Sequence, residues 1–171
     1  MCLSSIILGN VLARKKKILR LTGKIMDKEQ YLEALRVAFA SEFSFFLKAA
    51  NFHWNVEGSL FPQYHELFGN IYQEVYGSID TFAEELRAAR IYTPAAFETL
   101  DKLSEVECQE TVPNGMQMTQ ELLADSDTMA EMFHEVFMMA EAQHDHGLSN
   151  FLADRQDAHS KHSWMLRSTL K

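Results

Sequence analysis

Apolar side chains recur at intervals of three and four residues over four long stretches of this sequence. This spacing restricts the fold more than any other feature. In the first stretch the recurring residues are Leu32, Leu35, Phe39, Phe43, Phe46 and Leu47. Such intervals place apolar side chains on one face of an α-helix, whereas a half-buried strand would alternate. Only three prolines and seven glycines interrupt 171 residues, so long helices are favoured over strands and turns. The spacing therefore predicts an all-α protein.

The breaks between the stretches predict where the first two helices begin and end. Asp27, followed three residues later by Gln30, is typical of a capping box, and this helix is expected to continue to about Trp54. Ser59 is expected to cap the second helix. That helix should end near the sequence IYTP, because the residue before Pro94 is biased away from helical conformation.

The second helix carries two apolar stripes. Its main stripe consists of Tyr64, Leu67, Ile71, Val75, Ile79, Phe82 and Leu86, and beside it lie Phe61, His65, Phe68, Tyr72 and Tyr76. A helix that is apolar over so wide an arc has surface to bury on two sides. We expect one of those sides to face another subunit.

A long connection separates the second helix from the last two. AAFETLDKL predicts a short helix within this connection, which ends at VPNG. The third helix is expected to carry Leu122, Met129, Phe133, Val136 and Ala140 and to end near QHDHG, where Gly147 breaks the pattern. The fourth carries Leu148, Phe151, Leu152, Met165, Leu166 and Leu170. Four long helices with one long crossover are typical of ferritin-like bundles.

Charge is distributed unevenly along the chain. Residues 1–25 contain six basic residues and no acidic one: Arg14, Lys15, Lys16, Lys17, Arg20 and Lys24. Ten basic and 24 acidic residues remain in 26–171, which gives that part a net charge of −14, against −8 for the whole chain. An acidic body repels nucleic acid and attracts cations, while the basic stretch can do the reverse. We therefore predict a domain at 26–171 preceded by a disordered basic extension. The alternative is that translation starts at Met26 and the extension is absent.

The cysteines and the apolar runs indicate the compartment. Cys2 and Cys108 form no CxxC pair, which excludes a disulfide framework and a zinc ribbon and favours a reducing environment. No apolar run approaches the ~20 residues that cross a bilayer. SSIILGNVL precedes its positive charges, the reverse of a secretory signal. A cytoplasmic location is expected, close to the nucleoid if DNA is bound.

Two pairs of residues are candidate metal ligands. Asp80 and Glu84 lie four residues apart, so both carboxylates project from one helix face. His53 and His65 flank the turn between the first two helices. Each pair has a structural explanation of its own, as a solvated acidic edge and as hydrogen-bonded histidines at helix ends. Together they form a ligand set of two imidazoles and two carboxylates, which suits Fe(II).

The spacing also predicts that one chain cannot complete this site. His65 and Asp80 are 15 residues apart on one helix, hence ~22 Å apart along its axis. Their directions around that axis differ by only ~60°, so both face broadly the same side. If two second helices pair antiparallel about a two-fold axis, His65 of one chain meets Asp80 and Glu84 of the other, and His53 joins its own His65.

An internal metal site is the rival interpretation. Glu131 with His134, and Glu141 with His144, are Glu-x-x-His matches of the kind that internal di-iron bundles use on two helices. No second helix here supplies such a motif, so the internal site ranks below the interface site. The remaining histidines are expected at the surface or at helix ends: His144, His146, His159 and His162.

The sequence resembles the Dps family, the mini-ferritins that protect DNA in starved bacteria. The resemblance covers roughly residues 27–170 and rests on NFHWNVEGSLFPQYHELF, SIDTFAEELRA and ADRQDAHSKHSWMLRSTL. It implies a four-helix bundle assembled as a hollow homododecamer. It also implies interface sites that oxidise Fe(II), preferentially with hydrogen peroxide, and ferric mineral stored inside.

The family's ligand pattern falls on His53, His65, Asp80 and Glu84. This chain departs from the pattern at Gly69, where family members usually carry a carboxylate. Some relatives bind DNA through basic N-terminal tails, and ARKKKILRLTGK fits that description. A DNA-compacting protein with a weak or vestigial metal site is therefore a second functional hypothesis.

Overall fold

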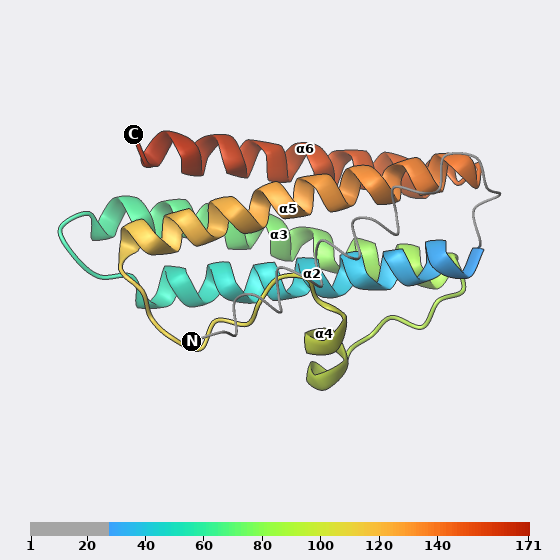
Figure 1. Ribbon diagram of the computed structural model, residues 1–171, viewed down its shortest axis with the longest axis horizontal. Coiled ribbons are helices and arrows are strands. Elements are labelled where there is room, and N and C mark those ends of the chain that lie inside the picture. The colour runs from blue at the N-terminus through green and yellow to red at the C-terminus, as the bar shows by residue number, and fades with distance from the viewer. Residues whose placement is uncertain (1–27) are drawn as a thin grey trace, which may run out of the picture.

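The computed structural model describes residues 28–171, which form five helices and no strand. Four helices are long: α2 (Lys28–Asn55), α3 (Phe61–Ala88), α5 (Gly115–Ala142) and α6 (His146–Thr169). Helices α2 and α3 form one antiparallel pair and α5 and α6 another, while the crossover between α3 and α5 returns along the bundle (Figure 1). The predicted bundle with one long crossover is confirmed. The basic residues 14–24 and the proposed cap Asp27 lie outside the described residues.

A single apolar core joins the four long helices. Wholly buried apolar side chains come from each of them and include Phe45, Phe68, Phe82, Phe133 and Leu152. Burying a side chain of this size contributes about 1.5–3 kcal/mol, so these contacts hold the helices in register. The main predicted stripe of α3 and the predicted stripe of α5 face this core, whereas Phe61 and Tyr76 of the second α3 stripe are exposed. Leu47, predicted on the core face of α2, is 40% exposed instead.

The crossover is held against α2 by its short helix and by polar contacts. Helix α4 (Phe97–Leu103) lies where AAFETLDKL predicts it and buries Leu100. The hydroxyl of Ser41 accepts a hydrogen bond from the Glu105 N–H at 2.9 Å. Farther along, Asn51 Nδ2 donates to the Gln109 carbonyl at 3.3 Å. These contacts fix the path of the connection along α2.

The start of α3 differs from the prediction. Leu60, not Ser59, is the N-cap residue, and no side chain caps this helix. Gly58 has a φ of 115°, a conformation that glycine adopts without steric cost, and its carbonyl accepts the Phe61 N–H at 3.1 Å. The Gly58 carbonyl thus accepts a hydrogen bond at the start of α3, where the Ser59 hydroxyl was expected to do so.

Two helices end close to the predicted places, near IYTP and QHDHG, but through backbone conformations that the sequence pattern did not indicate. Helix α3 ends at Ala88, before IYTP, because Arg90 is left-handed with a φ of 65° and the Ile91 N–H bonds to the Leu86 carbonyl at 2.9 Å. Helix α5 ends in the same way around His144, whose φ is 59°. Both are Schellman endings formed without glycine. Gly147 lies inside the first turn of α6 and breaks nothing.

None of the helices described over residues 28–171 has the length and apolar character that crossing a bilayer requires.

Candidate metal centre

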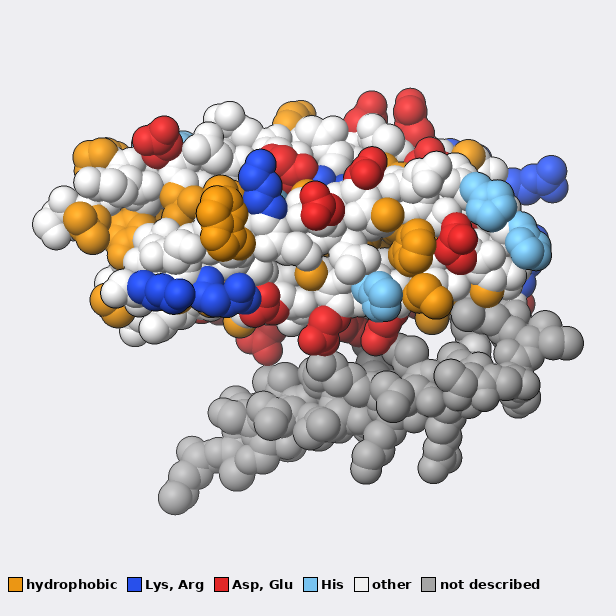
Figure 2. Space-filling model, turned by 90° about the horizontal axis from the view of Figure 1, so that it is seen from above, with side chains coloured by type: hydrophobic (Ala, Val, Ile, Leu, Met, Phe, Trp, Pro, Cys, Tyr) orange, Lys and Arg blue, Asp and Glu red, His pale blue; other side chains and the backbone are white. Residues whose placement is uncertain are grey.

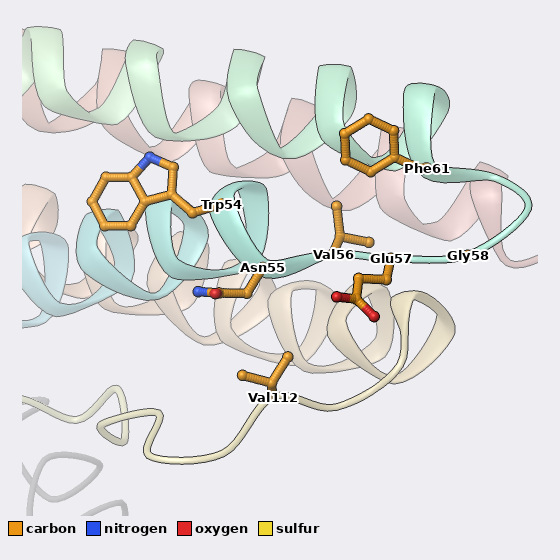
Figure 3. A pocket seen from close by; sticks show the side chains of 7 residues that line it. All are labelled: Trp54, Asn55, Val56, Glu57, Gly58, Phe61 and Val112. Carbon is orange, nitrogen blue, oxygen red and sulfur yellow. The ribbon is translucent and has the colours of Figure 1, made fainter.

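The two histidines that flank the α2–α3 turn face one another. His53 lies in the last turn of α2, and His65 lies in the second turn of α3. Between them Val56 is buried and points toward Phe61, whereas Glu57 points to the opposite side, toward Val112 (Figure 3). The packed turn brings the imidazoles into a stack, with ring centroids 3.7 Å apart and an angle of 22° between the planes.

Reciprocal hydrogen bonds fix both imidazoles. His53 Nδ1 lies 2.6 Å from the His65 carbonyl oxygen, and His65 Nδ1 lies 2.8 Å from the His53 carbonyl oxygen. A carbonyl only accepts, so each Nδ1 must carry the proton and donate. In the neutral ring the Nε2 lone pair is then free to bind a metal. This is the arrangement by which a backbone carbonyl orients a ligating histidine.

The two predicted carboxylates lie farther along the same helix. Asp80 and Glu84 are both exposed on α3. Because α3 is unbroken from Phe61 to Ala88, the 15 residues between His65 and Asp80 span ~22 Å. Within residues 28–171 no three His, Cys, Asp or Glu side chains are close enough together to hold a metal ion. The chain therefore presents an imidazole pair and a carboxylate pair as separate groups.

The rival internal sites are not in the bundle interior. Glu131 and His134 are both exposed on α5. Glu141 accepts hydrogen bonds from the Ser149 hydroxyl at 2.5 Å and pairs with His146 at 3.4 Å, while His144 is exposed at the end of α5. The prediction of an internal metal at Glu131 and His134 is wrong, because the Glu-x-x-His spacing selects a helix face and this face is turned to the outside.

A buried charged cluster occupies the bundle interior. Glu42 of α2 is wholly buried and receives hydrogen bonds from Arg155 Nε at 2.9 Å and from the Ser78 hydroxyl at 3.1 Å. Its second oxygen lies 2.7 Å from His159 Nε2. The other side of the Arg155 guanidinium contacts both carboxylate oxygens of Glu74, which is 41% exposed. A guanidinium thus joins α2, α3 and α6 in the bundle interior.

The pKa values in this cluster reflect burial and charge. Burial alone would raise the pKa of Glu42, but its contacts with His159 and Arg155 outweigh burial and lower the pKa to about 2. Burial and the neighbouring His159 lower the pKa of His162 to about 4. Glu42 is consequently an anion and His162 is neutral near pH 7.

Of the four other histidines discussed above, two lie where the sequence predicts and two do not. His144 and His146 lie exposed at the α5–α6 junction, as expected. His159 and His162 are buried in the core, so the prediction that they lie at the surface or at a helix end is wrong. They are tolerated there because His159 pairs with Glu42 and His162 lies 3.3 Å from Glu74.

Comparison with known proteins decides the family. Residues 32–171 match the family model described as a ferritin-like domain. The chain belongs to the ferritin-like family. This ferritin-like chain is 28% identical to general stress protein 20U of Bacillus subtilis, over 83% of its own length and 98% of that protein. It is also 28% identical to DNA protection during starvation protein 2 of Bacillus anthracis, over 83% and 97% of the two chains.

Solved structures agree with this assignment. Dps from Thermosynechococcus elongatus superposes on the ferritin-like chain with a TM-score of 0.81 and 26% identity, covering 84% of this chain and 92% of that one. Antigen TpF1 from Treponema pallidum gives a TM-score of 0.80 and 25% identity, covering 87% and 97%. The resemblance to the Dps family predicted from the sequence is confirmed.

Proposed function

We propose that this ferritin-like protein is a mini-ferritin that oxidises Fe(II) with hydrogen peroxide, stores the ferric product and so protects DNA. In this proposal His53 and His65 of one chain bind Fe(II) together with Asp80 and Glu84 of a partner chain, within a hollow homododecamer. The observation that carries the proposal is the reciprocal histidine pair. Its two Nε2 lone pairs are free, while the carboxylates that would complete a site lie ~22 Å along the same helix.

The chemistry asked of this site is electron transfer from iron to peroxide. Each Fe(II) gives up one electron, so two Fe(II) ions reduce one hydrogen peroxide. The O–O bond breaks with both electrons supplied by iron, and the two oxygen atoms either take up two protons from solvent and leave as water or enter the ferric product as oxide or hydroxide. Consuming Fe(II) and hydrogen peroxide together in this way avoids the hydroxyl radical that a one-electron cleavage of the O–O bond would release. The carboxylates offset the charge of the metal, and the imidazoles fix its position.

Surface charge supports a role in cation uptake. Residues 28–171 contain ten basic and 23 acidic residues, since Asp27 and the six basic residues before it lie outside this range. Acidic side chains are spread along the face on which α6 lies (Figure 2). A surface field of this sign raises the local concentration of cations.

A subunit-mixing experiment tests the shared site. His65→Ala and Asp80→Ala are each expected to abolish rapid Fe(II) oxidation, because each removes a ligand from every site. When the two variants are unfolded and reassembled together, half of the dimers are mixed and one of the two sites in each mixed dimer is intact. Stopped-flow oxidation with peroxide should therefore recover to about a quarter of the wild-type rate.

The control for this experiment is His134→Ala, which changes an exposed histidine of α5 and should leave the rate unchanged. Wild-type rates in both single variants would refute the site assignment. Two inactive variants that regain no activity on mixing would place all the ligands within one chain.

A second candidate function is DNA binding through the basic stretch. Residues 1–25 carry six positive charges and no negative charge, whereas the remainder of the chain carries −14. DNA affinity should therefore reside in the tail, and the metal site would be dispensable for it.

A further inference from the structure

The histidine pair lies against a glycine of α3. Gly69 is buried within the helix, and a Cβ atom built on it would lie 3.0 Å from both Cε1 and Nδ1 of His53. Contacts between real Cβ atoms and other heavy atoms are rarely so short. In this chain the His53 ring therefore lies so close to the α3 backbone that a Cβ at position 69 would press on it, and the ring would have to shift to admit the carboxylate that family members usually carry there.

The His53 ring has little freedom to yield to such a side chain. His65 stacks on one of its faces at 3.7 Å, and the Tyr72 ring centroid lies 5.0 Å away. Its Nδ1 is held by the His65 carbonyl at 2.6 Å. A methyl group at position 69 would have to displace the ring against these contacts. Because Nδ1 is one of the two closest atoms, the bond that fixes the tautomer would be strained first.

We propose that Gly69 is a positioning residue: the missing side chain allows His53 to lie against the α3 backbone, stacked on His65 with its Nδ1 on the His65 carbonyl and its Nε2 left free for a metal. The inference rests on the proposed function, since it assigns the histidine pair to a metal site. It also explains a glycine inside a long helix, where glycine costs up to ~1 kcal/mol relative to alanine. Glycine at position 69 thus lowers the stability of α3 relative to alanine, but it leaves the space that the His53 ring occupies.

The same helix provides a matched control. Gly77 also lies within α3, but a Cβ built there meets no atom within 4 Å. Within one chain, Gly77→Ala should therefore gain the helix propensity of alanine, up to ~1 kcal/mol, and leave the histidine pair of that chain undisturbed; light scattering checks that the variant assembles as the wild type does. Gly69→Ala should lose most or all of this gain, because the added methyl group meets the imidazole.

The experiment uses Co²⁺ as a spectroscopic probe of imidazole ligation in the assembled wild-type protein, Gly69→Ala, Gly77→Ala and His53→Ala. We expect Gly69→Ala to weaken Co²⁺ binding about 10- to 100-fold, as disturbed ligand orientation does, and to change the visible absorption band. Gly77→Ala should bind as the wild type does. Thermal unfolding of the same samples separates loss of the site from loss of the fold.

Gly69→Asp distinguishes positioning from a simple missing ligand. If Gly69 seats His53, the aspartate displaces the ring and weakens the first Co²⁺ bound. If position 69 only lacks a ligand, the aspartate should strengthen binding or add a second ion, and the positioning role is refuted. Wild-type Co²⁺ affinity and spectrum in Gly69→Ala would also refute it. A wild-type protein whose Co²⁺ spectrum does not depend on His53 would instead refute the proposed function.

Discussion

At the scale of single residues, Arg155 controls the charge balance of the bundle interior. It is 4% exposed and lies between the wholly buried Glu42 and the half-exposed Glu74. Methionine has a similar length but no charge, so Arg155→Met leaves the Glu42 anion with only His159 and Ser78 as partners. Removing one partner of a buried ion pair typically costs about 3–5 kcal/mol. We expect a loss of this size in urea unfolding, compared at one fixed protomer concentration.

Two further variants test whether burial causes this loss. Arg167 lies on the same helix and pairs with Asp127 at 3.2 Å on the surface, so Arg167→Met should cost less than about 1 kcal/mol. Adding Glu42→Gln to Arg155→Met removes the buried charge that lost its arginine partner and should restore part of the stability. Equal losses for the two arginine variants would show that the interior pair contributes no more than a surface pair.

The helical periodicity of the sequence indicated that Arg155, His159 and His162 lie in the core, but their polar residue types argued against it. Arg155, His159 and His162 fall at intervals of four and three residues between Leu152 and Leu166, which are both buried. The periodicity therefore indicated core positions, yet charged and titratable side chains are usually exposed. What makes them tolerable is Glu42, 113 residues before Arg155, and sequence spacing carries no information about such a distant partner.

At the scale of helices, existence, length and approximate ends were predictable, but the backbone conformations that end α3 and α5 were not. The apolar stripes of α2 and α3 cover almost the whole of each helix, since every turn packs against the core. Ends depend on the conformation of one residue. Arg90 and His144 take left-handed conformations although neither is glycine, so Pro94 and Gly147 indicated the neighbourhood of each end but not the residue that forms it. By contrast, Asn114 is a favoured capping residue, and it caps α5 at VPNG with Gln117 in a capping box.

This difference predicts a stabilising change at the end of α3. Glycine adopts the left-handed region without the steric cost that a Cβ imposes, so Arg90→Gly should raise the free energy of unfolding by about 1 kcal/mol. Ala88 precedes it by two residues and is helical, so Ala88→Gly should lower stability by up to about 1 kcal/mol. Chemical denaturation of both variants would show opposite signs. A loss of stability in Arg90→Gly would contradict the proposed ending.

At the scale of the whole molecule, the candidate site joins groups that one chain keeps apart. The spacing of His65 and Asp80 predicts their separation, because α-helical rise is constant over an unbroken helix. Sequence spacing did not predict the reciprocal bonds of the histidines, which depend on how the turn at Val56 and Gly58 folds back. A shared site makes metal chemistry depend on assembly. Twelve chains of 19.7 kDa would form a shell of ~240 kDa.

The last prediction separates assembly from DNA binding. Deleting residues 1–25 leaves Met26 first and removes six positive charges, but it leaves the described bundle intact. Light scattering should give a shell of twelve chains with or without the tail, while gel retardation of duplex DNA at low salt should require it. Binding by six to ten phosphate contacts weakens about 10³- to 10⁵-fold between 50 and 200 mM salt, so retardation should vanish over that range. Replacing the six basic residues by glutamine keeps the tail's length and should abolish retardation equally, because charge is what the phosphates recognise.

Equal retardation by the deleted protein would assign DNA binding to the acidic body. The deleted chain is also the product expected if translation starts at Met26, so its behaviour shows which function that product retains.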